Sequence, residues 1–136
     1  MIDGGGTREN TYDVGKNVVL PYLLDRGIKT IDYVIISHFD ADHCNGLIAI
    51  LENLNVKKVV FSKQFEMTSE HENIIEIIKR KNIKVQIVQS GDRIVIDKYT
   101  YLDILYPDFQ IPEKDLNNNS IVARFVYGNF SMLFTR

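Results

Sequence analysis

The sequence predicts an α/β fold, in which strands and helices alternate first and consecutive strands follow. Over the first ninety residues, short apolar runs alternate with segments whose apolar residues recur at helical spacing. After residue 90 the helical spacing stops, and turn residues separate short strand-like segments. This order predicts layered sheets covered by helices and excludes a single doubly wound parallel sheet.

Three short, nearly continuous apolar runs are typical of strands that are covered on both faces. They span residues 33–37, 58–61 and 84–88. Helices are predicted for residues 18–26, for a segment that starts just after His43, and for a segment from Ser69 to Lys81. Ser69 and Glu72 are predicted to form a capping box at the start of the last helix.

Helical spacing also predicts which side chains the second and third helices bury. These are Leu47, Ile50, Leu51 and Leu54 in the second helix, and Ile74, Ile77 and Ile78 in the third. The later strands are predicted at residues 93–96, 101–106, 121–127 and 130–134. Gly128-Asn129 joins the last two strands as a two-residue hairpin turn of the type that begins with glycine.

Composition limits the class of protein. The 136 residues include 45% hydrophobic and 25% charged side chains, which is typical of one soluble globular domain. The formal net charge of -2 excludes a strongly basic nucleic-acid arm but not a local basic patch. Apolar runs such as 47–51 are far shorter than the roughly 20 residues that span a bilayer. We therefore expect the chain to be soluble as it stands, whether or not it comes from a membrane protein.

Four potential metal ligands fall within six residues, directly after a predicted strand and before a predicted helix: His38, Asp40, Asp42 and His43. Residues i and i+2 of an extended segment point the same way, so His38 and Asp40 can converge on one ion. Asp42 and His43 follow where the chain turns into the helix, and they can converge on a second ion. Imidazole and carboxylate together suit Zn²⁺, Mn²⁺ or Fe²⁺.

The alternative interpretation of this segment is a polar surface loop whose aspartates cap the helix. Two histidines and two aspartates within six residues, next to a core strand, favour the metal site. Other polar residues have more ordinary interpretations. Cys44 is expected to be a buried core residue, His71 a surface residue, and the basic cluster 79–84 a solvated helix end.

The segment His38-x-Asp40-x-Asp42-His43 resembles the metal motif of the metallo-β-lactamase superfamily, HxHxDH, with aspartate at the second histidine. In the form SHxDxDHxxG it is similar to the β-lactamase-like domain of ComEC-type DNA-uptake competence proteins. Further stretches match that domain in the same order. They are the IDGG turn at 2–5, the LPYL…RGI helix at 19–28, the NNxSxV segment at 118–122 and the YGxFxxLLT segment at 127–135.

The resemblance implies an αββα sandwich with a hydrolytic centre of one or two divalent metals, zinc or manganese. Carried over by position, His38 and Asp40 would bind the first metal, and Asp42 and His43 the second, with Asp42 also orienting the attacking water. Asp3 would brace the metal loop from behind. The remaining family positions, which we expect in substrate binding or around the ligands, are Asn118, Asn119 and Ser120. An ordinary asparagine-rich turn is the alternative for the two asparagines.

ComEC-type proteins are membrane channels for incoming single-stranded DNA. The resemblance therefore implies phosphodiester hydrolysis of DNA, with DNA as partner and the cell membrane as the site of the parent protein. The family's ending reads TGD, and its aspartate bridges the metals, whereas here Arg136 follows Thr135. Relatives also have a strand pair before IDGG. We thus expect residues 1–136 to be a partial domain, truncated at both ends, of a larger membrane-anchored protein.

Two other functions remain open at this stage. One is a stand-alone hydrolase of the same superfamily that acts on a small ester, lactone or phosphodiester. The other is a catalytically silent fragment with weak or absent metal occupancy. Strand edges exposed by truncation would favour self-association in either case.

Overall fold

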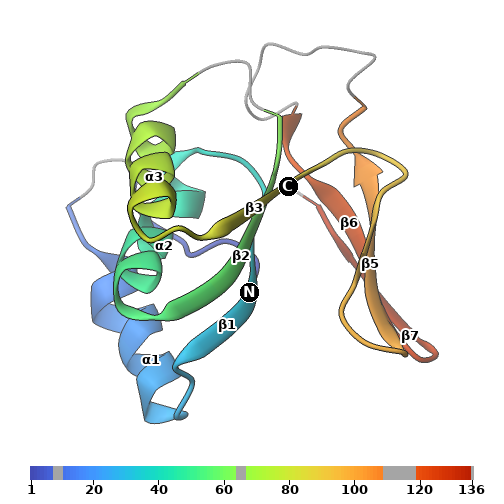
Figure 1. Cartoon of the computed structure of the whole chain (residues 1–136), viewed down its shortest axis with the longest axis horizontal. Helices are drawn as coiled ribbons and strands as arrows, with labels where there is room; N and C mark the ends of the chain where they lie inside the picture. Colours follow the sequence, from blue (N-terminus) through green and yellow to red (C-terminus); the bar gives the residue numbers. More distant parts are fainter. Residues whose placement is uncertain (8–10, 64–66, 109–118, 136) are drawn as a thin grey trace.

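The computed structural model of this chain describes residues 1–7, 11–63, 67–108 and 119–135. These residues form three layers, with helices on one side, a parallel sheet in the middle and an antiparallel sheet on the other side (Figure 1). The two sheets lie close together at one end of the molecule and diverge toward the other end (Figure 1).

The parallel sheet contains the three strands that the apolar runs predict. Its strands are β1 (Thr30–Ile36), β2 (Asn55–Ser62) and β3 (Lys84–Val88), in the order β1-β2-β3. Helices α2 (Ala41–Asn53) and α3 (Ser69–Arg80) make the two connections. Residues 1–3 extend the sheet beyond β1, because Ile2 forms a parallel bridge with Ile35.

The antiparallel sheet is the predicted meander. Its strands are β4 (Arg93–Val95), β5 (Thr100–Tyr106), β6 (Val122–Tyr127) and β7 (Phe130–Phe134), in that order. Gly128 has a φ of 55° in the turn between β6 and β7, while Asn129 has no positive φ. This is the predicted hairpin turn that begins with glycine.

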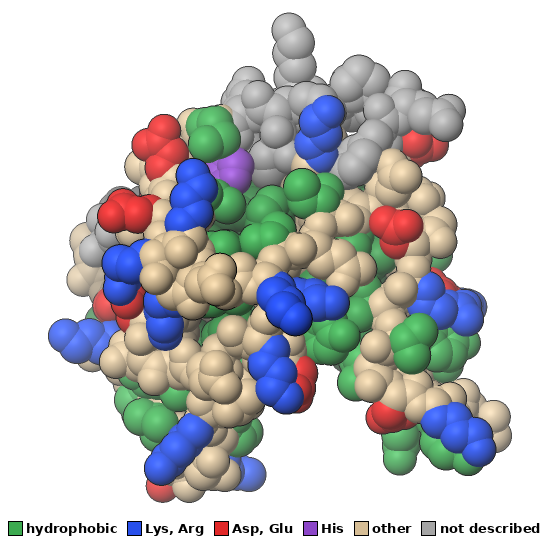
Figure 2. All heavy atoms as spheres, in the orientation of Figure 1, with side chains coloured by type: hydrophobic (Ala, Val, Ile, Leu, Met, Phe, Trp, Pro, Cys, Tyr) green, Lys and Arg blue, Asp and Glu red, His purple; other side chains and the backbone are tan. Residues whose placement is uncertain are grey.

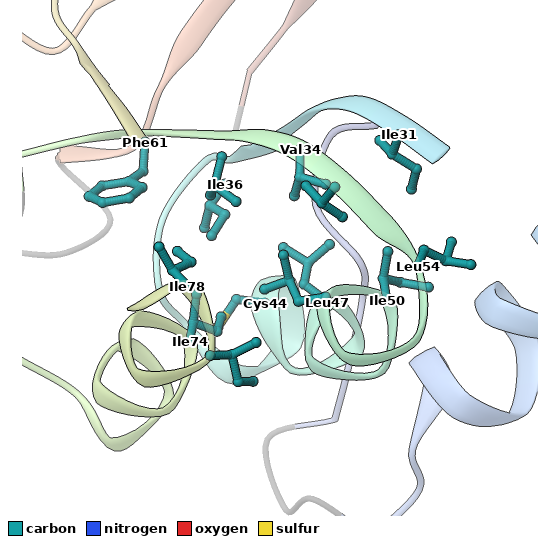
Figure 3. Close-up of a cluster of buried hydrophobic side chains, with 14 of the residues drawn as sticks. Ile31, Val34, Ile36, Cys44, Leu47, Ile50, Leu54, Phe61, Ile74 and Ile78 are labelled. Atoms are coloured by element: carbon teal, nitrogen blue, oxygen red, sulfur yellow. The ribbon is translucent and has the colours of Figure 1, made fainter. Parts of the chain in front are cut away.

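The main core lies between the parallel sheet and the helices. Figure 3 shows side chains of β1 and β2 pointing toward those of α2 and α3, with Val34 and Ile36 opposite Cys44 and Ile74. All seven side chains of the two predicted helical stripes are buried. A second core joins the two sheets, and it includes Ile35, Val60, Leu102 and Ile104.

Two helix starts differ from the prediction. Helix α2 begins at Ala41 rather than after His43, so that Asp42 and His43 belong to its first turn. Helix α3 is capped by Thr68, whose side chain accepts from the backbone N–H of His71, and not by Ser69. The cap moves by one residue because Thr68 also donates to the carbonyl of Phe39, which ties it to the loop after β1.

The first helical segment has two parts. A π-helical turn, Gly15–Val19 (η1), continues directly into α1 (Leu20–Asp25), which has proline in its first turn. Both pack on the side of α2 that faces away from α3 (Figure 1). Gly27 follows with a φ of 71°, the left-handed conformation that ends a helix readily only at glycine.

The basic cluster after α3 does more than face solvent. The Lys81 ammonium donates to the backbone carbonyls of Leu51, Glu52 and Leu54 at the carboxyl end of α2. Arg80 forms an ion pair with Glu52 in the same place. The end of α3 therefore caps its neighbour α2, where a positive charge complements the helix dipole.

The α/β class and the two facing sheets agree with the predicted sandwich. In the described part of the chain the helices cover only the parallel sheet, which accounts for three layers of an αββα sandwich. None of the helices that the structure describes is long and apolar enough to cross a membrane.

Candidate metal centre

The four residues of the predicted motif lie where β1 ends and α2 begins. His38 is buried, with 1% of its surface exposed, whereas Asp40, Asp42 and His43 are half-buried. Asp40 occupies the N-cap position of α2 in an extended conformation, but its side chain makes no capping hydrogen bond. Its Oδ2 instead lies 3.5 Å from Nε2 of His38. This geometry disfavours the helix-capping alternative for Asp40 and places its side chain next to that of His38.

Asp3 lies behind this loop and organises it. Its Oδ1 accepts from the backbone N–H of Ser37 at 2.8 Å, and its Oδ2 accepts from the Ser37 hydroxyl at 2.7 Å. The same Oδ2 lies 3.0 Å from Nδ1 of His43. Because a carboxylate only accepts hydrogen bonds, it selects the His43 tautomer with the proton on Nδ1.

The same arrangement reaches His38 through Ser37. The Ser37 hydroxyl gives its proton to Asp3, so the Nδ1 of His38, 3.0 Å from that oxygen, is the donor of their hydrogen bond. In the neutral form of each ring, Nε2 is then the nitrogen that carries the lone pair, and Nε2 of His38 lies 3.5 Å from Oδ2 of Asp40. The two rings are close neighbours, with centroids 4.1 Å apart. Imidazoles held by a carboxylate network at Nδ1 are the usual form of histidine ligands to metals.

The donor types and the histidine tautomers fit a divalent metal, but the ligands are not assembled into a complete set. Among the residues that the structure describes, no group of three or more His, Cys, Asp or Glu side chains is arranged to hold one ion. His38 pairs with Asp40, and Asp42 follows in the first turn of α2. The site thus has the chemistry of a metal centre without full coordination around one point.

Backbone contacts hold the Asp3 turn against the start of α2. The N–H of Gly4 donates to the carbonyl of His43, and the N–H of Gly46 donates to the carbonyl of Gly5, both at 2.8 Å. A Cβ atom placed on Gly46 would lie 2.1 Å from the Gly4 carbonyl oxygen. Glycine is required at position 46 because the two backbones touch there.

The segment before β6 crosses the same end of the parallel sheet. Asn119 and Ser120 are buried, and the Ser62 hydroxyl at the end of β2 donates to the carbonyl of Asn119 at 2.7 Å. The N–H of Ile121 donates to the carbonyl of Ser37, next to the motif. The structure therefore brings Asn119 and Ser120 to the predicted site, while Asn118 lies outside the described residues.

The end of β7 approaches the same place. Thr135 lines a cavity of about 220 Å³ together with Asp3 and Ser37. The first and last described segments of the chain thus meet behind the metal loop, although they are more than a hundred residues apart in the sequence.

His71 is buried, so its expected surface position is wrong. Its ring lies against Phe39, with centroids 4.2 Å apart, and Phe39 stands between His38 and Asp40. The stripe of Ile74 and Ile78 continues back to position 71 at helical spacing, and this pattern could have predicted the burial. His71 and Thr68 together dock the start of α3 onto the metal loop.

Cys44 is a core residue, as predicted. Burial raises the pKa of its thiol to about 12, and the carboxylates of Glu70, Asp3 and Asp40 act in the same direction. Because the thiolate is the reactive form, we expect dithionitrobenzoate at pH 8 to label the folded chain at least about 100-fold more slowly than the chain unfolded in guanidinium. Equal labelling rates in the two states would contradict the buried position.

Comparison with known proteins assigns the chain to a family. The family model of the metallo-beta-lactamase superfamily matches residues 1–131. This chain therefore belongs to the metallo-β-lactamase superfamily. It is also similar to ComE operon protein 3 of Bacillus subtilis (strain 168), with 28% identity over 145 residues. That match covers 99% of this chain and 18% of the relative, so the chain spans less than a fifth of that protein's length.

Solved structures show the same fold at low sequence identity. CmlA, a diiron β-hydroxylase from Streptomyces venezuelae, superimposes with a TM-score of 0.52 at 19% identity, over 79% of this chain and 20% of CmlA. The flavodiiron protein from Giardia intestinalis superimposes with a TM-score of 0.51 at 18% identity, over 91% of this chain and 26% of that protein. These likenesses establish the fold, and the site residues are argued from the geometry above.

Proposed function

We propose that this chain is the metal-dependent hydrolase domain of a ComEC-like DNA-uptake protein and that its reaction is phosphodiester hydrolysis of DNA. The observation that carries the metal-dependent part is the Asp3 network, which sets the tautomers of His38 and His43. The choice of DNA rests on the family motifs and on the likeness to ComE operon protein 3.

In this proposal His38 and Asp40 hold a first ion, and Asp42 and His43 a second. A divalent ion supplies Lewis-acid polarisation of the phosphoryl oxygen and lowers the pKa of water in its neighbourhood. Asp42 orients the attacking water and accepts its proton. Asp3 keeps both imidazoles oriented throughout, and Asn119 and Ser120 border the space for the substrate.

The proposal includes the setting of the domain. We propose that residues 1–136 form part of a longer membrane-anchored protein, because the matched relative is more than five times the length of the matched region. The domain would then meet DNA close to the membrane. The choice between zinc and manganese is left to the experiment, since both accept imidazole and carboxylate ligands.

The test is cleavage of a fluorescently labelled oligonucleotide, with added Mn²⁺ or Zn²⁺, by the complete domain, in which the strands before IDGG and the TGD segment of the family are restored. We expect metal-dependent cleavage that Asp42→Ala lowers at least about 100-fold, because removal of a general base costs that much or more. Asp25→Ala, on the exposed end of α1, is the matched control and should cleave like the unmodified chain. Activity that survives in Asp42→Ala would exclude the assigned role.

The main alternative is a catalytically silent domain, which the incomplete coordination among the described residues favours. It predicts substoichiometric metal in elemental analysis of the purified chain and no cleavage with either metal, while circular dichroism shows an intact fold. A stand-alone hydrolase of a small ester or lactone is the other alternative, and the net charge of -2 agrees with it. Metal-dependent turnover of such an ester without DNA cleavage would support it.

A further inference from the structure

A basic groove lies at the end of the parallel sheet opposite the metal centre. It has a volume of about 430 Å³, and its lining includes four lysines and a single acidic residue, Asp32. The lysines are Lys57, Lys58, Lys81 and Lys84. Figure 2 shows basic side chains gathered over the strands of the parallel sheet on this face. Such a local excess of positive charge contrasts with the formal net charge of the whole chain, which is -2.

Two of the lysines are held by an acidic side chain or by backbone carbonyls. Lys57 pairs with Asp32 at 2.7 Å, and the Lys81 ammonium donates to carbonyls at the end of α2. The remaining two, Lys58 and Lys84, lie side by side on adjacent strands, because they are register partners of β2 and β3. The groove therefore presents a pair of neighbouring cations.

The neighbours of this pair are an aromatic ring and amide groups. Tyr33 is the register partner of Lys58 on β1, and the Lys58 ammonium lies 5.2 Å from the centre of its ring. Asn55 and Asn82 also line the groove, and Gln86 accepts from Lys58 at 3.2 Å. One row across the sheet therefore carries an aromatic ring and two cations, and amide groups lie beside this row.

We propose that this basic groove binds the backbone of single-stranded nucleic acid. Neighbouring lysines neutralise phosphates, an aromatic side chain accepts a stacked base, and amides bond to sugar and base edges. The groove has the size of a small-ligand pocket and suits a short stretch of one strand, not a duplex. The inference deepens the proposed function, because it gives the substrate of the metal centre a second contact.

The position of the groove agrees with that role. Lys58 and Ser62 are four residues apart on β2, which is about 13 Å at the rise of a strand. Ser62 bonds to the segment beside the metal loop. A bound strand that reaches both sites has to run around the core between the sheets, because Val60, which lies between Lys58 and Ser62 on β2, is fully buried.

The experiment measures binding of a labelled twelve-nucleotide single strand by fluorescence anisotropy, in EDTA and between about 50 and 200 mM salt. Lys58→Glu/Lys84→Glu tests the groove. Lys16→Glu/Lys98→Glu is the matched control, since it makes the same charge change at exposed lysines of other elements. We expect at least a roughly tenfold weaker affinity for the groove variant and less than about a twofold change for the control.

A second variant guards against misfolding. Lys58→Gln/Lys84→Gln keeps polar side chains without the charges, and its fold is checked by circular dichroism. The slope of log affinity against log salt should be shallower by about 1.4 for this variant, which is the value for two lost phosphate contacts on a single strand. An unchanged slope and affinity in the folded variant would overturn the proposal.

Three other outcomes would also overturn it. The first is that the unmodified chain does not bind the oligonucleotide. The second is that the groove and control variants lose the same amount of affinity. The third is that the unmodified chain binds phosphatidylglycerol vesicles but not the oligonucleotide, and that the groove variant loses this vesicle binding. Failure of the metal centre is separate, because the binding measurement is made in EDTA and needs no metal. Binding of the strand without cleavage of DNA would support the groove proposal and reject the proposed hydrolase function.

Discussion

Asp3→Asn is expected to lower the affinity of the chain for Zn²⁺ or Mn²⁺ by about 10- to 100-fold while the fold persists. The carboxylate of Asp3 accepts from Ser37 twice and from His43 once. An amide of the same shape has only one accepting oxygen, and its NH₂ group would face the donors on the other side. If its NH₂ group took the place of Oδ2, both imidazoles would lose their tautomers, and if it took the place of Oδ1, the metal loop would lose the hydrogen bond from the Ser37 N–H.

Isothermal titration of the purified chain with each metal measures this effect. Asp25→Asn serves as control, because Asp25 is exposed at the end of α1 and is not part of the metal loop. Nitrogen chemical shifts of the histidine rings provide a readout that a general loss of stability would not change. Unaltered metal affinity together with unaltered tautomers in Asp3→Asn would contradict the role assigned to Asp3.

Gly46→Ala is expected to destabilise the fold by at least about 3 kcal/mol, the upper range for overpacking in a close-packed interior. In an exposed helix this substitution stabilises by about 1 kcal/mol, so the expected sign is opposite. The reason is the Gly4 carbonyl, which the new methyl group would meet at 2.1 Å. Gly15 also packs closely on this turn of the helix, since a Cβ at Gly15 would lie 2.1 Å from the carbonyl oxygen of Gly46.

Urea unfolding followed by circular dichroism measures the change in the free energy of unfolding. Gly27→Ala is the matched control, because a Cβ at Gly27 meets no atom within 4 Å. Its cost should be only the roughly 1–2 kcal/mol of a left-handed alanine. If Gly46→Ala were as stable as the unmodified chain, the close approach between the Asp3 turn and α2 would be wrong.

The elements of the fold could be predicted well because their signals are local. Apolar runs marked the parallel strands, and helical spacing marked the buried faces of α2 and α3. The boundaries were less accurate where a tertiary contact competes with a local preference. Ser69 has a capping pattern, yet Thr68 caps α3, because its hydroxyl also reaches the carbonyl of Phe39.

Burial of polar side chains was harder to predict for the same reason. The sequence neighbours of His71 are Glu70 and Glu72, which are typical of an exposed helix, but the His71 ring packs on Phe39. Lys81 follows α3 in sequence, but its ammonium donates hydrogen bonds to backbone carbonyls at the end of α2. Partners such as these, about thirty residues away along the chain, leave no local pattern to read.

The sequence by itself determined the α/β class, the order of the strands and the four ligand-type residues of the motif, since periodicity and spacing are properties of neighbouring residues. The tertiary structure decided how those ligands are held. Asp3 reaches His43 across forty positions, and Ser62 reaches Asn119 across fifty-seven. Only the folded arrangement of strand ends brings such distant groups within hydrogen-bond distance, and it leaves Lys58 and Lys84 side by side at the other end of the sheet.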